Sequence, residues 1–410
     1  MKRKIVAATA VLGLGVQGFA AGYMIPEQSI ASTAKAGASV AVNDGAETAY
    51  YNPAAMSWLE KGRMLEAGLT IVNSKAVEFD GSVYSSAAGA FLPASAESEA
   101  VSSVLPFFHY VAPGEGAWRW GASLTVPSGT KKAWDSPFQK AMAQEFYMSV
   151  VEMAPAVSYK IDDRWSVGGA LRLIRASGTV RISSDALGYK EKTQGDTFAT
   201  AVALAVSYRP CEEGTLALTY RSGTMLDLEG TAKGHLSAGA YPYNTDGSVN
   251  VPLPSVLTLA GAYTFGKTQV ELTVERIGWS MYDELDFDFD DAVVDGALGT
   301  PIPKDWDDTT TVRLGVTHRL DDAWTLMAGL AKDPTPIPEE TVEFSLPDSD
   351  GTLYALGAKY KLDDSWKIGA AYLLSQKADR KVSGTKSLRG IDGEFSSSAS
   401  LLTFGAEYRF

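Results

Sequence analysis

The sequence predicts an all-β protein, a 14-stranded antiparallel transmembrane β-barrel plugged by a small N-terminal hatch. From Arg63 onward, apolar and polar or small residues alternate in runs of roughly ten residues, the period of a strand with one apolar face and the length that crosses a bilayer at a tilt. Short and long connections alternate strictly along the chain, which is typical of outer-membrane barrels. Residues 21–61 lack the alternation and precede the strands.

Residues 1–20 have the features of a secretory signal peptide. Positions 2–4 are positively charged, residues 5–16 form an apolar run, and residues 18–20 form a small-x-small cleavage site. The apolar run is too short to span a bilayer as a helix. We therefore expect export and a mature chain that starts at Ala21.

The composition excludes several classes of protein. The net charge of −13 becomes −16 when the three positive charges of the leader are removed, and such an acidic chain is a poor partner for nucleic acid. The single cysteine, Cys211, cannot form an internal disulfide. No segment after the leader has 18 consecutive apolar residues, so an ordinary transmembrane helix is not expected. A large secreted β protein or a membrane β-barrel remains.

Residues 21–61 are predicted to fold as a compact unit around the stretch 43–59. Asn52-Pro53 is a turn signal, because proline fixes its own φ and disfavours helix at the residue before it. The asparagine side chain can bond backbone groups two residues on. Taken alone, this unit fits either a surface arm or a plug, and the barrel expected over residues 62–410 favours the plug.

The expected strands are defined by the alternation and by the turns between them. Tight turns are expected at 112–116, 161–163, 209–212, 265–267, 320–322 and 362–364, and long loops at 74–101, 127–146, 183–195, 227–254, 279–307, 333–350 and 376–399. The strands are expected near 63–73, 102–111, 117–126, 147–160, 164–182, 196–208, 213–226, 255–265, 268–278, 308–319, 323–332, 351–361, 365–375 and 400–410.

Three of the tight turns are near copies of one another. Each has an aspartate pair that makes the turn and a tryptophan that starts the next strand, at Trp165, Trp324 and Trp366. Aromatic residues at one end of a barrel form the girdle at a membrane interface. The alternative is an ordinary soluble hairpin with tryptophan in its core, but the recurrence on the short-turn side favours the girdle.

The chain ends on an alternating strand whose last residue is Phe410. A terminal phenylalanine on such a strand is similar to the assembly signal of outer-membrane barrels, so we expect the barrel assembly machinery as a partner. Pairing of the last strand with the first leaves no free edge in lipid, where unpaired backbone is costly.

Six short motifs in order carry a resemblance to a known family: Ala21-Gly22-Tyr23, Asn52-Pro53-Ala54, Trp165-Ser-Val-Gly168, Ala217-Leu-Thr-Tyr-Arg-Ser222, Asp333-Pro-Thr-Pro-Ile-Pro338 and Ser345-Leu-Pro-Asp348. On these motifs, residues 21–410 resemble the FadL-type long-chain fatty acid outer-membrane transporter family, which also includes aromatic-hydrocarbon transporters. The resemblance implies a 14-stranded barrel with an N-terminal hatch.

The resemblance also implies roles for several residues. Asn52, Pro53 and Ala54 would belong to the hatch, and Tyr23 would be the aromatic residue that reaches into a ligand pocket. Pro127 and Gly129 would form an inward kink that opens the wall sideways, which fits the missing ladder donor of proline. The alternative for these two residues is the first turn of a long outside loop.

The loop 127–146 is the expected capture site. Trp134, Phe138, Met142 and Phe146 recur at four-residue spacing, which places them along one side of a short helix. The alternative is that this stripe packs on the barrel rim or forms the core of the loop.

A carboxylate head group needs a cation, and arginine suits it best because it can pair bidentately. The resemblance places the family's head-group arginine within one position of Arg181. The second cation of the family would fall at Asp307, with Lys304 as a possible substitute three residues earlier. This departure leaves a neutral hydrocarbon ligand open.

The sequence gives little support for catalysis, a metal or a cofactor. His109, His235 and His318 lie far apart and outside any known catalytic pattern. We therefore expect a passive transporter of long-chain fatty acids or similar apolar molecules in the bacterial outer membrane. It would be a monomer in contact with membrane lipid and lipopolysaccharide. The alternatives are the same scaffold carrying aromatic or alkane hydrocarbons, a barrel enzyme and a general porin.

Overall fold

The computed structural model describes residues 22–410, except 115, 185–187 and 237–239. The predicted leader, residues 1–20, and the expected start at Ala21 lie outside the described residues. Within the described part of the chain, no helix is long and apolar enough to cross a membrane.

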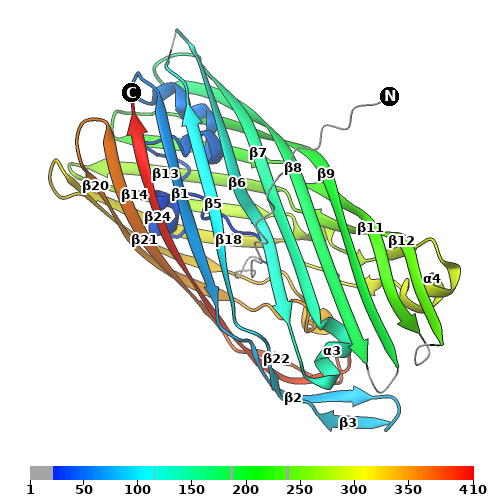
Figure 1. The fold of residues 1–410 in the computed structure, drawn as a ribbon. Helices are drawn as coiled ribbons and strands as arrows, with labels where there is room; N and C mark the ends of the chain where they lie inside the picture. Colours follow the sequence, from blue (N-terminus) through cyan, green and yellow to red (C-terminus); the bar gives the residue numbers. More distant parts are fainter. Residues whose placement is uncertain (1–21, 115, 185–187, 237–239) are drawn as a thin grey trace, which may run out of the picture.

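The described chain forms a closed antiparallel barrel of 14 strands, as the alternation predicted (Figure 1). The first strand pairs with the second on one side and with the last on the other, so the sheet has no free edge around most of its circumference. The wall strands, two of which are interrupted once, are β1 (Met64–Ser74), β5 (Val101–Val111), β6 (Trp118–Ala133), β7 (Glu145–Lys160), β8 (Trp165–Ser184), β9 (Tyr189–Tyr208), β10 (Gly214–Arg221) continued by β11 (Thr224–Leu236), β12 (Tyr241–Leu253) continued by β13 (Val256–Phe265), β14 (Thr268–Ile277), β18 (Thr309–Arg319), β19 (Trp324–Asp333), β20 (Gly351–Lys361), β21 (Trp366–Lys377) and β24 (Ser398–Arg409).

The expectation of a long loop over 227–254 was wrong. The structure extends the wall there as β11 and β12, which pair over 13 residues each. The expected loop over 183–195 is also mostly strand, since β8 runs to Ser184 and β9 starts at Tyr189. These strands project beyond the others at the end of the barrel that carries the long connections (Figure 1).

The other long connections carry small elements of their own. In one small sheet, β2 pairs with β3, β4 and β23, and β23 also pairs with β22. Elsewhere β15 pairs with β17, and β16 pairs with the wall strand β12. The bounds of these elements are β2 (Glu78–Ser85), β3 (Ala90–Pro93), β4 (Ala96–Glu97), α3 (Pro137–Ala143), η3 (Trp279–Met281), β15 (Glu284–Leu285), β16 (Phe287–Phe289), α4 (Ala292–Leu298), β17 (Ile302–Pro303), η4 (Glu339–Thr341), β22 (Arg380–Val382) and β23 (Ile391–Ser396).

The short-turn end of the barrel carries an outward-facing aromatic girdle. In each repeated turn, the first aspartate accepts hydrogen bonds from two backbone N–H groups, as Asp162 does from Arg164 and Trp165 at 2.7 Å. The tryptophans after these three turns, and Trp118 after another tight turn, each stack or tilt against a tyrosine on the neighbouring strand. The described pairs are Trp118–Tyr159, Trp165–Tyr208, Trp324–Tyr360 and Trp366–Tyr408, with ring centroids 4.3 to 4.7 Å apart.

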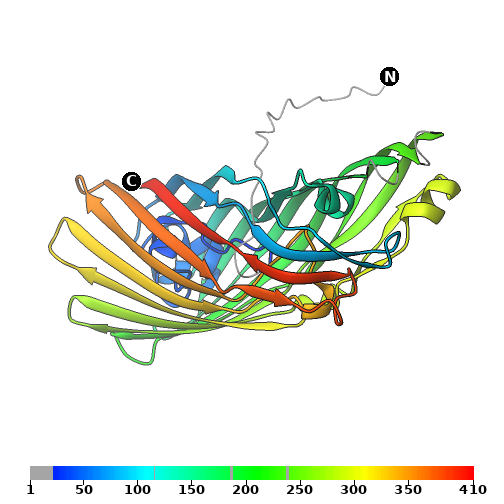
Figure 2. The ribbon, with the colours of Figure 1, turned by 90° about the horizontal axis from the view of Figure 1, so that it is seen from below.

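Residues 22–61, the N-terminal segment, lie inside the barrel near its short-turn end (Figures 1 and 2). The segment contains α1 (Ile30–Ala34), α2 (Thr48–Tyr51) and the 3-10 helix η1 (Pro53–Trp58). Ser29 caps α1 by accepting a hydrogen bond from the Ser32 N–H at 3.0 Å. Gly37 follows with a φ of 85°, and a Cβ there would lie 2.7 Å from the Arg313 guanidinium, so only glycine fits.

Candidate functional site

The N-terminal segment is held to the wall by buried ion pairs. Arg313 on β18 is 1% exposed; it pairs with Glu275 at 2.6 Å, lies 3.5 Å from Glu27, and donates to the Ala36 carbonyl at 2.9 Å. Because buried charges are stable only when paired, this arginine joins the segment firmly to the wall.

A second group of wall residues binds the same segment. Glu271 accepts hydrogen bonds from the Val40 and Ala41 N–H groups at 2.6 and 2.7 Å. Lys359 on β20 pairs with Glu407 of the last strand and lies 3.7 Å from Glu47 of the segment. In addition, the Thr33 hydroxyl hydrogen-bonds the Thr403 hydroxyl at 2.9 Å, across 370 residues of sequence.

The Asn52-Pro53-Ala54 motif packs against the wall strands β8 and β9. The Asn52 side chain donates to the Val40 carbonyl and to the Ser207 hydroxyl, both at 2.9 Å, and caps η1 at the Ala55 N–H at 3.4 Å. The backbone of Pro53 and Ala54 approaches Gly168 so closely that a Cβ there would lie 2.5 Å from the Ala54 nitrogen.

We predict that Asn52→Ala lowers uptake and leaves the barrel folded. The substitution deprives the buried Val40 carbonyl of its donor, at a cost of about 1–3 kcal/mol that falls on the N-terminal segment. Uptake assays and the heat-dependent shift of the folded band in gels measure the two effects. Asn73→Ala, at an exposed position of β1, is the control. Unchanged uptake in Asn52→Ala would contradict a functional role of the motif.

The strand β6 has an irregularity at Pro127, which we call the kink. Its register with β7 shifts between Thr125 and Ser128, which is a β-bulge. At the bulge the β6 backbone bonds the N-terminal segment: the Ile25 N–H donates to the Pro127 carbonyl at 2.8 Å, and the Gly129 N–H donates to the Tyr23 carbonyl at 2.9 Å. Since β6 continues to Ala133, the proline lies within a strand and not at the first turn of a loop.

The kink leaves a gap in the barrel ladder. Among the described residues, β5 and β6 pair only over residues 108–111 and 121–124, whereas β5 pairs with β1 along all of 101–111. Pro106, two residues past the last pair, lacks the N–H that would continue a ladder. Between Phe108 and the bridge of Ser98 with Trp134, the wall between β5 and β6 is therefore not closed by strand pairing.

Tyr23 forms the centre of a pocket at the kink, which we call the tyrosine pocket. Its ring lies edge-on to Trp279 with centroids 4.8 Å apart and tilts against Trp306 at 5.7 Å. Its hydroxyl donates to the Pro252 carbonyl. Phe146, Tyr282, Lys304, Ile337 and Glu343 also line this pocket.

The tyrosine pocket contains one buried ion pair. Lys304 donates to Glu343, and the Arg389 Nε lies 3.9 Å from the other oxygen of that carboxylate. Burial alone would raise the pKa of Glu343, but Lys304 and Arg389 outweigh burial and hold that pKa below its ordinary value. The carboxylate therefore stays ionised, and it neutralises the cation that a ligand would meet.

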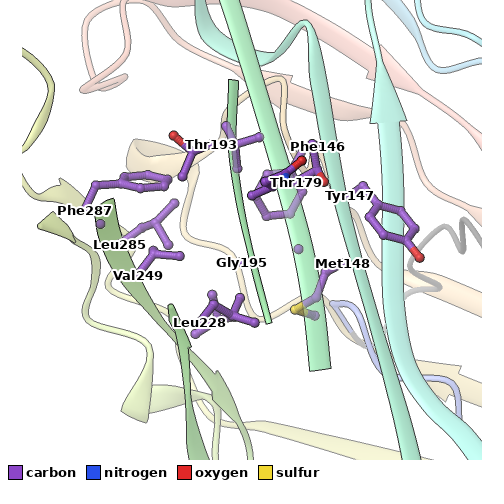
Figure 3. Close-up of a pocket in the computed structure, with 15 residues that line it drawn as sticks. Phe146, Tyr147, Met148, Thr179, Thr193, Gly195, Leu228, Val249, Leu285 and Phe287 are labelled. Carbon is purple, nitrogen blue, oxygen red and sulfur yellow. The ribbon is translucent and has the colours of Figure 1, made fainter. Parts of the chain in front are cut away.

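A second pocket, the apolar pocket, adjoins the first and shares Phe146, Met148 and Val251 with it. In Figure 3, Leu285 and Phe287 lie opposite the strand of Gly195, whereas Tyr147 points away. None of the described residues that line it carries a charge. The two cavity volumes are only about 30 and about 10 Å³, far below the roughly 150 Å³ that accommodates benzene. Side chains must therefore move before either pocket can hold a ligand.

The structure brings together some of the residues expected from the sequence. Tyr23, Phe146 and Lys304 line the tyrosine pocket, and Tyr23 also bonds the kink at Gly129. Arg181 lies elsewhere: its guanidinium pairs with Glu145 at 2.9 Å and is 46% exposed. Its neighbour Val180 lines the apolar pocket instead, because adjacent strand residues face opposite sides of the wall.

The expected helical stripe was wrong. Only Phe138 and Met142 lie in α3, whereas Phe146 belongs to β7 and Trp134 forms an isolated bridge with Ser98. Trp134 is buried and donates its indole N–H to the Phe344 carbonyl at 2.8 Å. Phe138 and Met142 pack against the same outer-loop core, so these three side chains do not line either pocket.

Comparisons with known proteins identify relatives along nearly the whole chain. Residues 11–410 match the family described as outer membrane protein transport protein (OMPP1/FadL/TodX). A long-chain fatty acid transport protein of Escherichia coli O6:H1 is 22% identical, with 91% of each chain covered. Outer membrane protein P1 of Haemophilus influenzae is 24% identical, with 91% of this chain and 90% of the relative covered.

Solved structures show the same fold. A Pseudomonas aeruginosa FadL homologue superposes with a TM-score of 0.83 at 19% identity, covering 95% of this chain and all of that one. The Pseudomonas putida toluene transporter TodX superposes with a TM-score of 0.71 at 20% identity, covering 93% of this chain and 98% of that one.

Proposed function

Because the chain belongs to the outer membrane protein transport protein family (OMPP1/FadL/TodX), we propose that it takes up long-chain fatty acids or similar hydrophobic molecules without an energy source beyond their gradient. The protein is an outer-membrane β-barrel.

The observation that carries the proposal is the continuity of three features. The apolar pocket adjoins the tyrosine pocket, and the backbone of Tyr23 bonds the kink beside the β5–β6 gap. Burial of each ligand methylene along this path stabilises the ligand by about 0.8 kcal/mol relative to water. Burial in the membrane at the end of the path stabilises it equally. A ligand can therefore move from the outer pockets to the lipid without entering water.

The N-terminal segment serves as a hatch in this proposal. Arg313, Glu271 and Lys359 bind it to three separate strands, and breaking even one buried pair costs several kcal/mol. Expulsion of the whole segment in each transport cycle is therefore disfavoured. A local shift of residues 22–25, whose backbone bonds β6 at Pro127 and Gly129, moves Tyr23 and opens the sideways exit, provided that the Tyr23 hydroxyl releases the Pro252 carbonyl.

A ligand in the tyrosine pocket meets Lys304, a cation that is already paired with Glu343. Lys304 is paired with Glu343, but Glu343 also has Arg389 nearby, so the lysine can be shared with the carboxylate of a fatty acid. This arrangement supports a fatty acid as the ligand of the tyrosine pocket. The uncharged lining of the apolar pocket supports the second candidate, a neutral aromatic or alkane hydrocarbon.

Lys304→Met tests the ligand. We expect it to weaken oleate binding by about tenfold or more, because a charge-assisted hydrogen bond contributes roughly 1.5–3 kcal/mol, and to leave naphthalene binding within about twofold. Equilibrium dialysis of the purified protein measures both. Lys386→Met is the matched control, since Lys386 pairs with Glu339 at the exposed surface. Unchanged oleate binding would favour the neutral hydrocarbon, and binding of neither probe by the native protein would contradict the transport proposal.

Several partners are part of the same proposal. Phe410, which is half exposed and bonded through its backbone to Arg63, supports recognition by the barrel assembly machinery. We also propose a monomer in contact with lipid and lipopolysaccharide, since the outward side chains of the wall include exposed leucines such as Leu259 and Leu356. We propose no enzymatic activity: His109 is buried against the Gln28 carbonyl, and His318 hydrogen-bonds Thr268 in the wall.

A further inference from the structure

Four glycines form one continuous row across four neighbouring strands of the wall. Gly178 of β8 lies opposite Gly195 of β9, Gly195 lies opposite Gly230 of β11, and Gly230 lies opposite Gly247 of β12. All four occupy inward-facing positions, since they continue the less exposed face of each alternating strand, as Ala176 and Leu228 do on β8 and β11. At this level the four strands place no side chain of their own on the inner wall, and the nearest side chains are Leu228 beside Gly178 and Phe289 beside Gly247.

The glycine row forms one side of the apolar pocket. Gly178, Gly195 and Gly247 line it; Leu285 and Phe287 lie opposite the strand of Gly195 (Figure 3), whereas Gly247 lies on β12, which pairs with the strand of Phe287. The lining residues differ in how firmly they are held: β8 and β9 pair over a long ladder and Phe287 pairs with Val249 of the wall, whereas β15, which carries Leu285, pairs with β17 over only two residues. When the pocket widens, Leu285 is therefore the lining residue that moves, and Gly178 and Gly195 stay as a flat surface.

Close approach of neighbouring strands explains why glycine is required at only some positions of the row. A Cβ on Gly230 would lie 1.9 Å from the Gln194 carbonyl oxygen, so this position requires glycine for the close approach of two strands. A Cβ on Gly178 would meet the Leu228 Cδ1 at 3.2 Å and the Tyr147 carbonyl oxygen at 3.5 Å. The first contact is with the end of a flexible side chain, so the fold does not require glycine at position 178.

We propose that the glycine row is a ligand-facing surface that selects molecules by thickness. A flat aromatic ring or a straight chain can lie against the glycine backbone under Leu285 and Phe287, whereas a compact, globular hydrocarbon cannot. The inference rests on the proposed transport function and adds the residues that set its specificity. It assigns the apolar pocket to neutral ligands, because its lining carries no charge.

The first test compares two hydrocarbons of ten carbon atoms with different shapes. The purified full-length protein in detergent is dialysed against naphthalene, which is flat, or adamantane, which is globular. We expect naphthalene to bind at least about tenfold more tightly, the size of discrimination that a shaped apolar pocket provides. Equal binding of the two, or tighter binding of adamantane, would overturn the proposal.

The second test adds one methyl group to the glycine row, at position 178. Gly178→Ala should weaken naphthalene binding by about tenfold, since one extra carbon in an apolar pocket has effects of this order, and should leave oleate binding within about twofold. Gly261→Ala is the matched control, because a Cβ there would also meet one leucine methyl, Leu216 Cδ2, at 3.2 Å, but far from the pocket. This control should bind both probes as the native protein does.

A third variant separates filling of the pocket from general damage. Leu228→Ala removes the methyl that the new Cβ would meet, so Gly178→Ala combined with Leu228→Ala should recover most of the naphthalene affinity. Native affinity in Gly178→Ala, equal losses in Gly178→Ala and Gly261→Ala, or no recovery in the double variant would each overturn the inference. If the native protein binds neither naphthalene nor oleate, the transport function itself fails.

Discussion

Arg313→Met is expected to loosen the N-terminal segment and to lower the temperature at which the folded barrel unfolds. The change leaves Glu27 and Glu275 as buried carboxylates without their shared cation and removes the donor to the Ala36 carbonyl. Removal of one partner of a buried ion pair typically costs about 3–5 kcal/mol. The heat-dependent band shift in gels measures the stability, and ion conductance in planar bilayers measures how well the bore stays blocked.

The neighbouring strand offers the control. Arg276 on β14 is 53% exposed and pairs with Asp308 at 3.4 Å, so Arg276→Met removes a surface pair worth about 0–1 kcal/mol. It should change neither stability nor conductance. If Arg313→Met behaved like Arg276→Met in both measurements, the buried pairs would not be what holds the segment.

Closing the gap between β5 and β6 is expected to abolish uptake and to leave binding. Deletion of Pro127 removes the extra residue of the bulge, and Pro106→Thr restores an N–H on the opposite strand, so the two strands can extend their ladder. A continuous ladder has no passage for an alkyl chain. We expect uptake of labelled oleate by cells that make this variant to fall to the level of cells without the protein.

Binding measurements make this outcome specific. The closed variant should still bind oleate within about tenfold of the native protein, because Lys304 and Glu343 lie outside the two altered strands. Pro155→Thr, a change at another strand proline with full native pairing to β6, should transport normally. Normal uptake by the closed variant would show that ligands leave by another route.

The barrel could be predicted because its determinants are local. Alternation, tight aspartate turns and girdle tryptophans each act within one hairpin, and the structure confirms the 14 strands. The error over 227–254 has the opposite cause. Beyond the membrane both faces of β11 and β12 can be polar, as at Glu229, so the alternation fades although the ladder continues.

The ligand site was less predictable, because it joins residues that are distant in sequence. The resemblance supplied Tyr23 and Lys304, but Trp279, Trp306 and Glu343 come from long loops in which no motif marks them as neighbours of Tyr23. The uncertain register at Arg181 mattered most: one residue separates an outward arginine from Val180, which lines the apolar pocket. The glycine row becomes visible only when the register of four strands is known.

The bond between Thr33 and Thr403 has a consequence for biogenesis. The N-terminal segment is synthesised before the barrel strands, yet Lys359 and Glu407, which hold it, are among the last residues to be synthesised. Contacts of such long range form late, after the intervening chain has been ordered. A polypeptide that stalls before its final hairpin would therefore carry an N-terminal segment that is not yet bound to the wall. The pore would be blocked only when the last strand completes the barrel.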